Sequence, residues 1–279
     1  MTPPRIRAGF GAGFGLWAAL ALLPPGLAAP LVAQQAFPYR LTPGREGMLL
    51  GGGAATLAAG GVVNAELDLL TPADIAALDP TDINRFDRPA TTHWSPASST
   101  LSDGVLLATI AGPLSLMAVA PGSVAPVTVG VMLGETILLV NGVGQLTKTA
   151  FRRTRPFAYN ADPEVPFEKK TSKSARQSFP SGHAANAFAS AVFLSTVYAR
   201  LHPSSPARPW VWGGSLAVAA TVGYLRYNAG KHYPTDILAG AVLGGAIGWL
   251  VPRMHEDDRA ALAIAPGPDG TVVCLALRI

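Results

Sequence analysis

The sequence has few charged residues and almost no cysteine. Charged residues make up 14% of its 279 positions, against roughly 25% in ordinary soluble domains. The single cysteine, Cys274, excludes an intramolecular disulfide and any metal site made of several cysteines. Hydrophobic residues reach 49%, so we expect a chain that buries much of its surface or contacts lipid.

Many of the basic residues are concentrated between positions 148 and 176. They are Lys148, Arg152, Arg153, Arg155, Lys169, Lys170, Lys173 and Arg176. Such a run is usually a solvated loop, and the alternative is a site for an anion. A nucleic-acid interface is the weaker candidate, and we do not expect a nucleic-acid partner.

The first 33 residues have the pattern of an export signal. Arg5 and Arg7 precede an apolar stretch over 8–27, and the small residues Ala29 and Ala33 suit a cleavage site. We therefore expect residues 1–33 to be a signal peptide, with an uncleaved N-terminal anchor helix as the alternative. Either way, the rest of the chain is expected at the membrane or beyond it.

Six apolar blocks predict an all-α bundle of six helices. They span 48–65, 104–120, 127–146, 184–199, 210–227 and 237–251. Each is long enough for a buried helix, and most approach the ~20 residues of a membrane span. Glu135 lies inside the third block, and because a carboxylate is costly against lipid, it should face the bundle interior.

The apolar blocks also suggest boundaries along the chain. We expect an N-terminal helix and polar insert over 34–103, the core over 104–253, and a tail over 254–279. Apolar residues on either side of Pro266–Gly270 predict a short β-hairpin in this tail.

Two polar clusters lie beside the third and fourth blocks. Lys148 and Arg155 follow the third block, and an arginine fork with a lysine point charge suits phosphate oxygens. Ser181, Gly182 and His183 open the fourth block after a proline. A serine N-cap, a glycine and the free N–H groups of a helix start favour an anion, and the histidine can transfer a proton.

A third cluster surrounds the start of the last block. Arg226 is followed by His232 and Asp236, four positions apart. At this spacing the carboxylate can reach one imidazole nitrogen, fix the tautomer and leave the other nitrogen as a nucleophile. Taken alone, a His-x-x-x-Asp pair is more often structural than catalytic.

The order K-x6-R-P, P-S-G-H and R-x5-H-x3-D resembles the tripartite signature of the type-2 phosphatidic acid phosphatase (PAP2) superfamily. The similarity extends over about residues 100–250, and Leu225 departs from the Ser or Gly usual before the arginine. The resemblance implies a PAP2-type bundle and hydrolysis of a phosphate monoester or diphosphate, with a phosphorylated lipid ahead of a small phosphate ester as substrate.

The resemblance also implies roles for individual residues. Phosphate would be bound by Lys148, Arg155, Ser181, Gly182 and Arg226. His183 would be the general acid, His232 the nucleophile that forms a phosphohistidine, and Asp236 the residue that orients it. The family's chemistry implies no metal and no other cofactor, since cations of the protein neutralise the phosphate charge.

Two other functions remain open at this point. A vanadate-dependent haloperoxidase shares the same anion pocket, and a non-catalytic membrane protein could use the cations only to bind an anion. The expected location is outside the cytoplasm, either membrane-associated with the site on the periplasmic or outer face, or soluble in the periplasm. His255 and Glu256 lack the second histidine of a zinc-binding helix.

Overall fold

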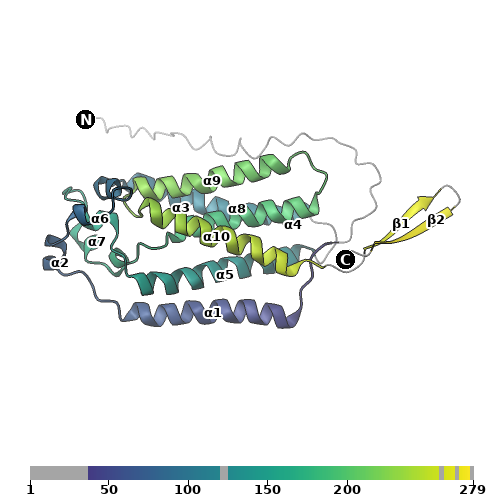
Figure 1. Ribbon diagram of the computed structural model, residues 1–279, viewed down its shortest axis with the longest axis horizontal. Helices are drawn as coiled ribbons and strands as arrows, with labels where there is room; N and C mark the ends of the chain where they lie inside the picture. Colours follow the sequence, from purple (N-terminus) through teal and green to yellow (C-terminus); the bar gives the residue numbers. More distant parts are fainter. Residues whose placement is uncertain (1–36, 120–124, 258–260, 268–269, 277–279) are drawn as a thin grey trace, which may run out of the picture. The chain divides into compact units, whose positions relative to one another are not determined.

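Six long helices dominate the part of the chain that the computed structural model describes, residues 37–119, 125–257, 261–267 and 270–276. They are α1 (Pro43–Ala65), α3 (Pro96–Ala111), α5 (Ala125–Phe151), α8 (Gly182–Leu201), α9 (Arg208–Asn228) and α10 (Pro234–His255). Each contains or overlaps one predicted apolar block, and the architecture is an all-α bundle (Figure 1). The predicted signal over 1–33 lies outside the described residues.

Helix α3 begins eight residues before its apolar block because the local sequence provides a start there. The Ser95 side chain accepts a hydrogen bond from the Ser98 N–H, and Pro96 occupies the first helical position. The rest of the block continues as η3 (Gly112–Ser115) and α4 (Leu116–Val119).

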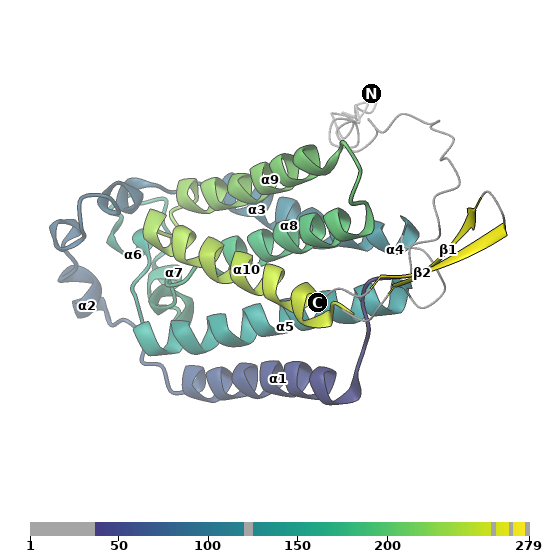
Figure 2. The same ribbon diagram turned by 45° about the vertical axis from the view of Figure 1, so that its right-hand side comes forward.

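The shorter elements lie in the two long connections. The first holds α2 (Pro72–Ala76), η1 (Pro80–Asp82) and η2 (Arg88–Thr92), and the second holds α6 (Pro156–Tyr159), α7 (Phe167–Lys170) and η4 (Lys173–Arg176). In Figures 1 and 2, α2, α6 and α7 gather at the end of the bundle where α5 ends and α10 begins.

Helix α8 is central, since it packs against α3, α5, α9 and α10. Its contact with α10 is unusually close because Gly240, Gly244 and Gly248 form a stripe spaced by four residues. A Cβ added to Gly240 would lie 2.5 Å from the Ser181 carbonyl oxygen, and one added to Gly244 would lie 1.9 Å from that of Ala185. The stripe therefore lets the two backbones touch near the start of both helices.

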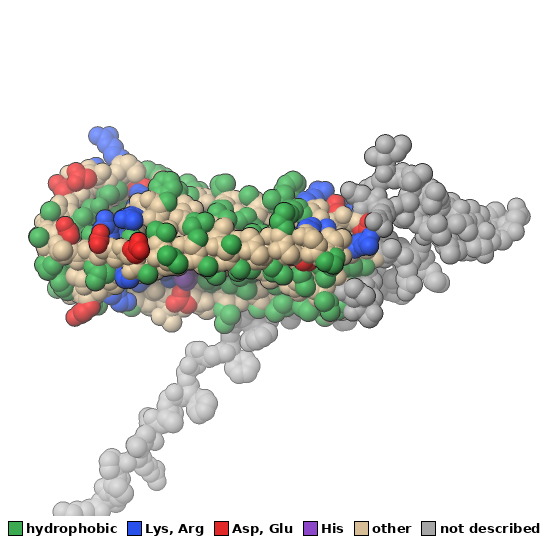
Figure 3. All heavy atoms as spheres, turned by 90° about the horizontal axis from the view of Figure 1, so that it is seen from below, with side chains coloured by type: hydrophobic (Ala, Val, Ile, Leu, Met, Phe, Trp, Pro, Cys, Tyr) green, Lys and Arg blue, Asp and Glu red, His purple; other side chains and the backbone are tan. Residues whose placement is uncertain are grey.

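Four segments are long and apolar enough to cross a membrane, judged by length and composition. They are Pro43–Ala65, Pro96–Ala118, Ala125–Tyr159 and Pro234–His255. Apolar side chains cover the middle of the face drawn in Figure 3, while charged side chains gather toward its ends. We therefore describe the chain as a membrane protein with four candidate spans.

Two of the six predicted blocks do not qualify as candidate spans. Helix α8 buries polar residues such as Asn186 and Ser190 within the bundle, and α9 has Arg208 at its start and Arg226 near its end. Helix α8 is mostly buried among other helices, whereas much of α9 is exposed, including Trp210 and Tyr224. Block length alone could not distinguish these helices from spans.

The tail contains two strands, β1 (Ala261–Gly267) and β2 (Gly270–Ala276), which form a two-stranded sheet. Most of this sheet belongs to a compact unit separate from the helical one. All the residues considered below lie in the helical unit.

Candidate active site

The predicted site residues converge from four helix ends. Lys148 lies in the last turn of α5, Ser181 caps α8, Arg226 lies in the last turn of α9, and Asp236 lies in the first turn of α10. The backbone N–H of Ser181 donates to the Asp236 carbonyl oxygen at 2.9 Å, which joins the second and third motifs directly.

The first motif meets the second at a glycine. A Cβ added to Gly182 would lie 3.0 Å from Lys148 Nζ. The ammonium group therefore rests against the backbone that opens α8, where free N–H groups also favour an anion. A larger residue at position 182 would displace the lysine.

His232 is buried among the cations of all three motifs, with 1% of its surface exposed. Its pKa is held well below the ordinary value, first by burial and then by the charges of Arg155, Arg226, Lys148 and His183. The structure thus brings these five side chains close enough to interact. The imidazole is neutral near pH 7 and keeps a lone pair for attack.

The tautomer of His232 is set by a contact that the sequence did not reveal. Its Nδ1 lies 2.8 Å from the Ser178 carbonyl oxygen, to which it donates. The Asp236 carboxylate, expected to be the direct partner, is 3.7 Å from the same nitrogen, which is longer than a hydrogen bond. With Nδ1 protonated, Nε2 carries the lone pair.

Asp236 is instead held by other groups. Its carboxylate accepts from the Tyr233 N–H at 2.9 Å, from the Ser178 hydroxyl at 2.5 Å and from Arg153 at 2.5 Å. Arg153 also pairs with Asp87 of the insert at 2.7 Å. Ser178 therefore links the two residues, since its hydroxyl donates to Asp236 and its carbonyl accepts from His232.

Asp103 of α3 is a further member of the site that the motifs do not include. Its Oδ1 lies 2.7 Å from His183 Nε2 and 3.3 Å from the Arg226 guanidinium. Burial and the charge of Arg226 lower the pKa of His183 to about 4, although the Asp103 hydrogen bond opposes this shift. A lone carboxylate just before an apolar block was the only signal in the sequence.

The two buried arginines retain free donors. Arg155 and Arg226 are 9% and 6% exposed, and in the described part of the chain neither Nε has a hydrogen-bond partner. Leaving a buried donor unpaired costs about 1–3 kcal/mol. A tetrahedral oxyanion bound among these cations would supply acceptors and remove this cost.

Ser181 lies at the site, but its hydroxyl already has a partner. The side chain is fully buried and accepts from the Ala184 N–H at 3.4 Å, as expected of an N-cap. Of the predicted residues, the structure therefore places six near one another, namely Lys148, Arg155, Gly182, His183, Arg226 and His232. Ser181 and Asp236 support them.

Comparison with known proteins identifies related sequences. Residues 129–260 match the PAP2 superfamily. The chain is 30% identical over 128 residues to an undecaprenyl-diphosphatase of Sulfolobus acidocaldarius, covering 46% of this chain and 56% of the relative. It is 42% identical over 72 residues to a lipid A 4'-phosphatase of Bacteroides thetaiotaomicron, covering 26% and 28%.

The matched region, residues 129–260, contains all three motifs, whose order predicted this family. Among solved structures, a transmembrane PAP2-type phosphatidylglycerolphosphate phosphatase of Bacillus subtilis matches with a TM-score of 0.42 and 21% identity, over 72% of this chain and 94% of that one. The alignments span about half the length, or less, of the two curated relatives described above.

Proposed function

We propose that this protein is a metal-independent phosphatase that hydrolyses a lipid phosphate monoester or diphosphate through a phosphohistidine. The observation that carries the proposal is the buried neutral imidazole of His232, whose Nδ1 is held by Ser178 while three cations and His183 surround it. Binding an anion requires only the cations, so the oriented lone pair favours covalent chemistry.

In the proposed first step, Nε2 of His232 attacks phosphorus and the bond from phosphorus to the leaving oxygen breaks. His183 gives its proton to that oxygen, so the leaving group departs as a neutral alcohol or as a phosphate. Lys148, Arg155 and Arg226 neutralise the charge on the phosphoryl oxygens in the transition state. The product of this step is a phosphohistidine.

In the second step water attacks the phosphohistidine. His183, now neutral, accepts a proton from the water as the bond to Nε2 breaks, and inorganic phosphate leaves. This returns both histidines to their starting states. Because His183 has a pKa of about 4 in the free site, we infer that the negative charge of the bound substrate raises it enough for proton donation.

An apolar hollow near the site supports a lipid substrate. It has a volume of about 280 Å³ and is lined by Phe86, Gly223, Tyr224, Tyr227, Pro234, Ile237 and Leu238. These residues come from the insert and from the same ends of α9 and α10 that carry Arg226 and Asp236. The relatives, an undecaprenyl-diphosphatase and lipid A phosphatases, point to the same substrate class.

We further propose that the protein is exported to the membrane with its site on the periplasmic or outer face. The candidate spans favour this location over a soluble periplasmic one. Carbonate washing of membranes would separate the two, because an integral protein stays in the pellet and a peripheral one is released.

The central experiment is a phosphate-release screen with the purified full chain. Prenyl diphosphate, phosphatidic acid, phosphatidylglycerol phosphate, lipid A and a soluble ester are compared without added metal. His232→Ala is expected to abolish release, whereas His202→Ala, at the far end of α8, is expected to behave as wild type. A phosphoryl group trapped on the wild-type protein, and missing from His232→Ala, would identify the nucleophile.

Two results would redirect the proposal. Halide oxidation with added vanadate, together with no release from any ester, would indicate a haloperoxidase-like enzyme. Tight phosphate binding that survives His232→Ala, with no turnover, would indicate a non-catalytic anion-binding protein.

A further inference from the structure

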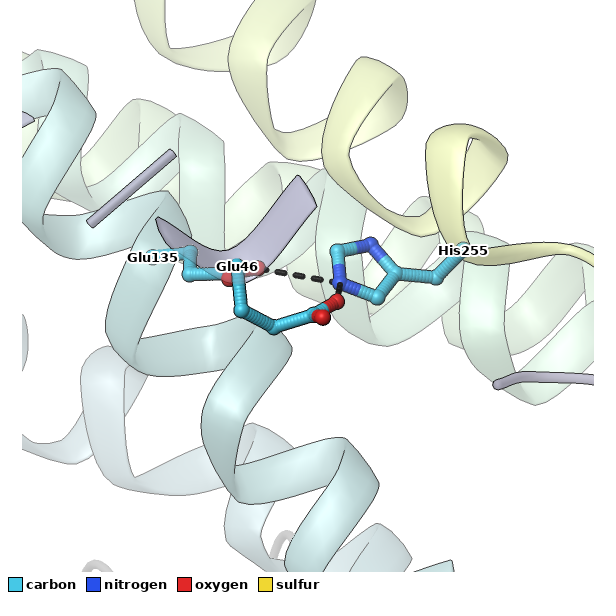
Figure 4. A group of neighbouring side chains, drawn as sticks. All are labelled: Glu46, Glu135 and His255. Carbon is cyan, nitrogen blue, oxygen red and sulfur yellow. Dashed lines mark ion pairs between the residues drawn. The ribbon is translucent and has the colours of Figure 1, made fainter. Parts of the chain in front are cut away.

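A second cluster of polar side chains is buried far from the phosphate site. Glu46 of α1, Glu135 of α5 and His255 of α10 point toward one another (Figure 4). Asp236 and His255 lie at opposite ends of α10, so the cluster is roughly 28 Å from the phosphate site at 1.5 Å per residue. The proposed phosphatase chemistry uses none of these residues.

The protonation of His255 makes this arrangement unusual. Its Nδ1 lies 2.8 Å from the Val251 carbonyl oxygen and must donate to it. Its Nε2 lies 3.1 Å from Glu46 Oε1 and 3.1 Å from Glu135 Oε2. In a neutral imidazole this nitrogen carries a lone pair, so three electron-pair donors face one another, and either a proton or a metal ion must lie between them.

The protein itself does not supply that cation to Glu135. Glu135 is fully buried, and neither of its carboxylate oxygens has a hydrogen-bond partner within the described ranges. The nearby Arg45 binds Glu46 Oε1 at 3.0 Å and the Met254 carbonyl oxygen at 2.6 Å. A buried carboxylate without a partner costs several kcal/mol, so its position favours a bound ion.

We propose that Glu46, Glu135 and His255 bind one divalent transition-metal ion, with zinc as the best match. Their ligand atoms all lie within 4.8 Å of one another. Zinc binds histidine nitrogen and carboxylate oxygen at 2.0–2.2 Å, so neighbouring ligands in a tetrahedron are about 3.4 Å apart. The two 3.1 Å separations come close to this value.

The chemistry of the donors narrows the choice of ion. Calcium and magnesium prefer an all-oxygen shell, whereas imidazole suits zinc and other first-row transition metals. The bond from Nδ1 to a backbone carbonyl is the usual outer contact of a metal-binding histidine, because it fixes the ring and its tautomer. Water would complete the fourth position.

The proposed ion has a structural role. It ties α1, α5 and α10 together at the end of the bundle away from the phosphate site. Other contacts strengthen the same junction, since the Arg40 N–H donates to the His255 carbonyl oxygen at 2.9 Å and the backbones of Tyr39 and Glu256 form an antiparallel β-bridge. The ion therefore stabilises the fold and takes no part in phosphate release.

The test measures metal in the full chain, purified with a tag that contains no histidine. Elemental analysis should find about one zinc ion per chain. A strong chelator should lower the melting temperature, and zinc, but not magnesium, should restore it. Cobalt(II) added to the stripped protein should give the visible absorption of a tetrahedral site.

A substitution with a matched control locates the ion. Glu135→Gln keeps the shape of the side chain and should weaken zinc affinity at least tenfold, as even the loss of an outer contact often does. The exposed Glu164→Gln should leave zinc content unchanged. If Glu135→Gln does not fold, the chelator and cobalt measurements on wild-type protein still show whether the chain binds a metal ion.

One pair of results would overturn the site. Zinc far below one ion per chain, with a melting temperature that neither chelator nor zinc alters, would mean that a proton occupies the cluster. This test does not depend on the proposed phosphatase activity, because an inactive protein can still bind the ion.

Discussion

Replacing Gly240 by alanine should damage the phosphate site without touching any of its reactive groups. The new Cβ would lie 2.5 Å from the Ser181 carbonyl oxygen, whereas ordinary van der Waals contact begins at about 3.4 Å. Helices α8 and α10 must therefore separate by roughly 1 Å where they carry Ser181 and Asp236. The obstacle is backbone, so no side-chain rotation can relieve it.

The size of the effect follows from this displacement. A shift of about 1 Å in catalytic geometry can reduce a rate by about 10²-fold. Overpacking of a tight interior typically costs about 1–3 kcal/mol of stability. We therefore expect phosphate release by Gly240→Ala to fall about 100-fold in kcat while the protein still folds. Initial rates at saturating substrate and a thermal melt of the same sample measure the two effects.

Gly245, five residues further along α10, provides a matched control. A Cβ on Gly245 would lie 3.8 Å from Val192 Cγ2 of α8, which is an ordinary van der Waals contact. Gly245→Ala should therefore keep both rate and melting temperature. Equal activities for the two variants would refute the claim that the close approach of α8 and α10 aligns the site.

Three further predictions concern the polar groups. Asp103→Asn should lower kcat about tenfold. It should also shift to lower pH the pKa that His183 contributes to the pH dependence of kcat, because Asp103 raises the pKa of His183. Asp236→Asn should retain more activity than His232→Ala in phosphate-release assays, because the tautomer is fixed by a backbone carbonyl. Thermal stability should fall as pH drops from about 6.5 toward 4, because His183 and His232 are neutral in the folded protein but bind protons in the unfolded chain. Added phosphate should reduce this loss of stability. A melting temperature that does not change over this pH range would contradict the prediction.

The sequence predicted the features that depend on local pattern. The apolar blocks located the long helices, Glu135 is buried as its place in an apolar block required, and Ser181 caps α8. The order of the three motifs indicated the family and the residues that meet, because each motif lies at a helix end and a bundle brings helix ends together.

The features that the sequence did not predict depend on contacts between distant segments. The Ser178 carbonyl that holds His232 has no sequence signature, since every residue carries a carbonyl. Arg153 was one of many basic residues, and only the fold pairs it with Asp87 and Asp236. His255 looked isolated because its proposed partners lie on two other helices.

The hollow beside α9 and α10 has a consequence for how such an enzyme would meet its substrate. A lipid whose chain lies against Tyr224 and Leu238 could present its headgroup to the cations while the chain stays in the bilayer. Encounters would then occur by diffusion in two dimensions. Turnover would depend on the mole fraction of substrate among the surrounding lipids, and diluting the membrane with inert lipid would slow the reaction at constant bulk concentration.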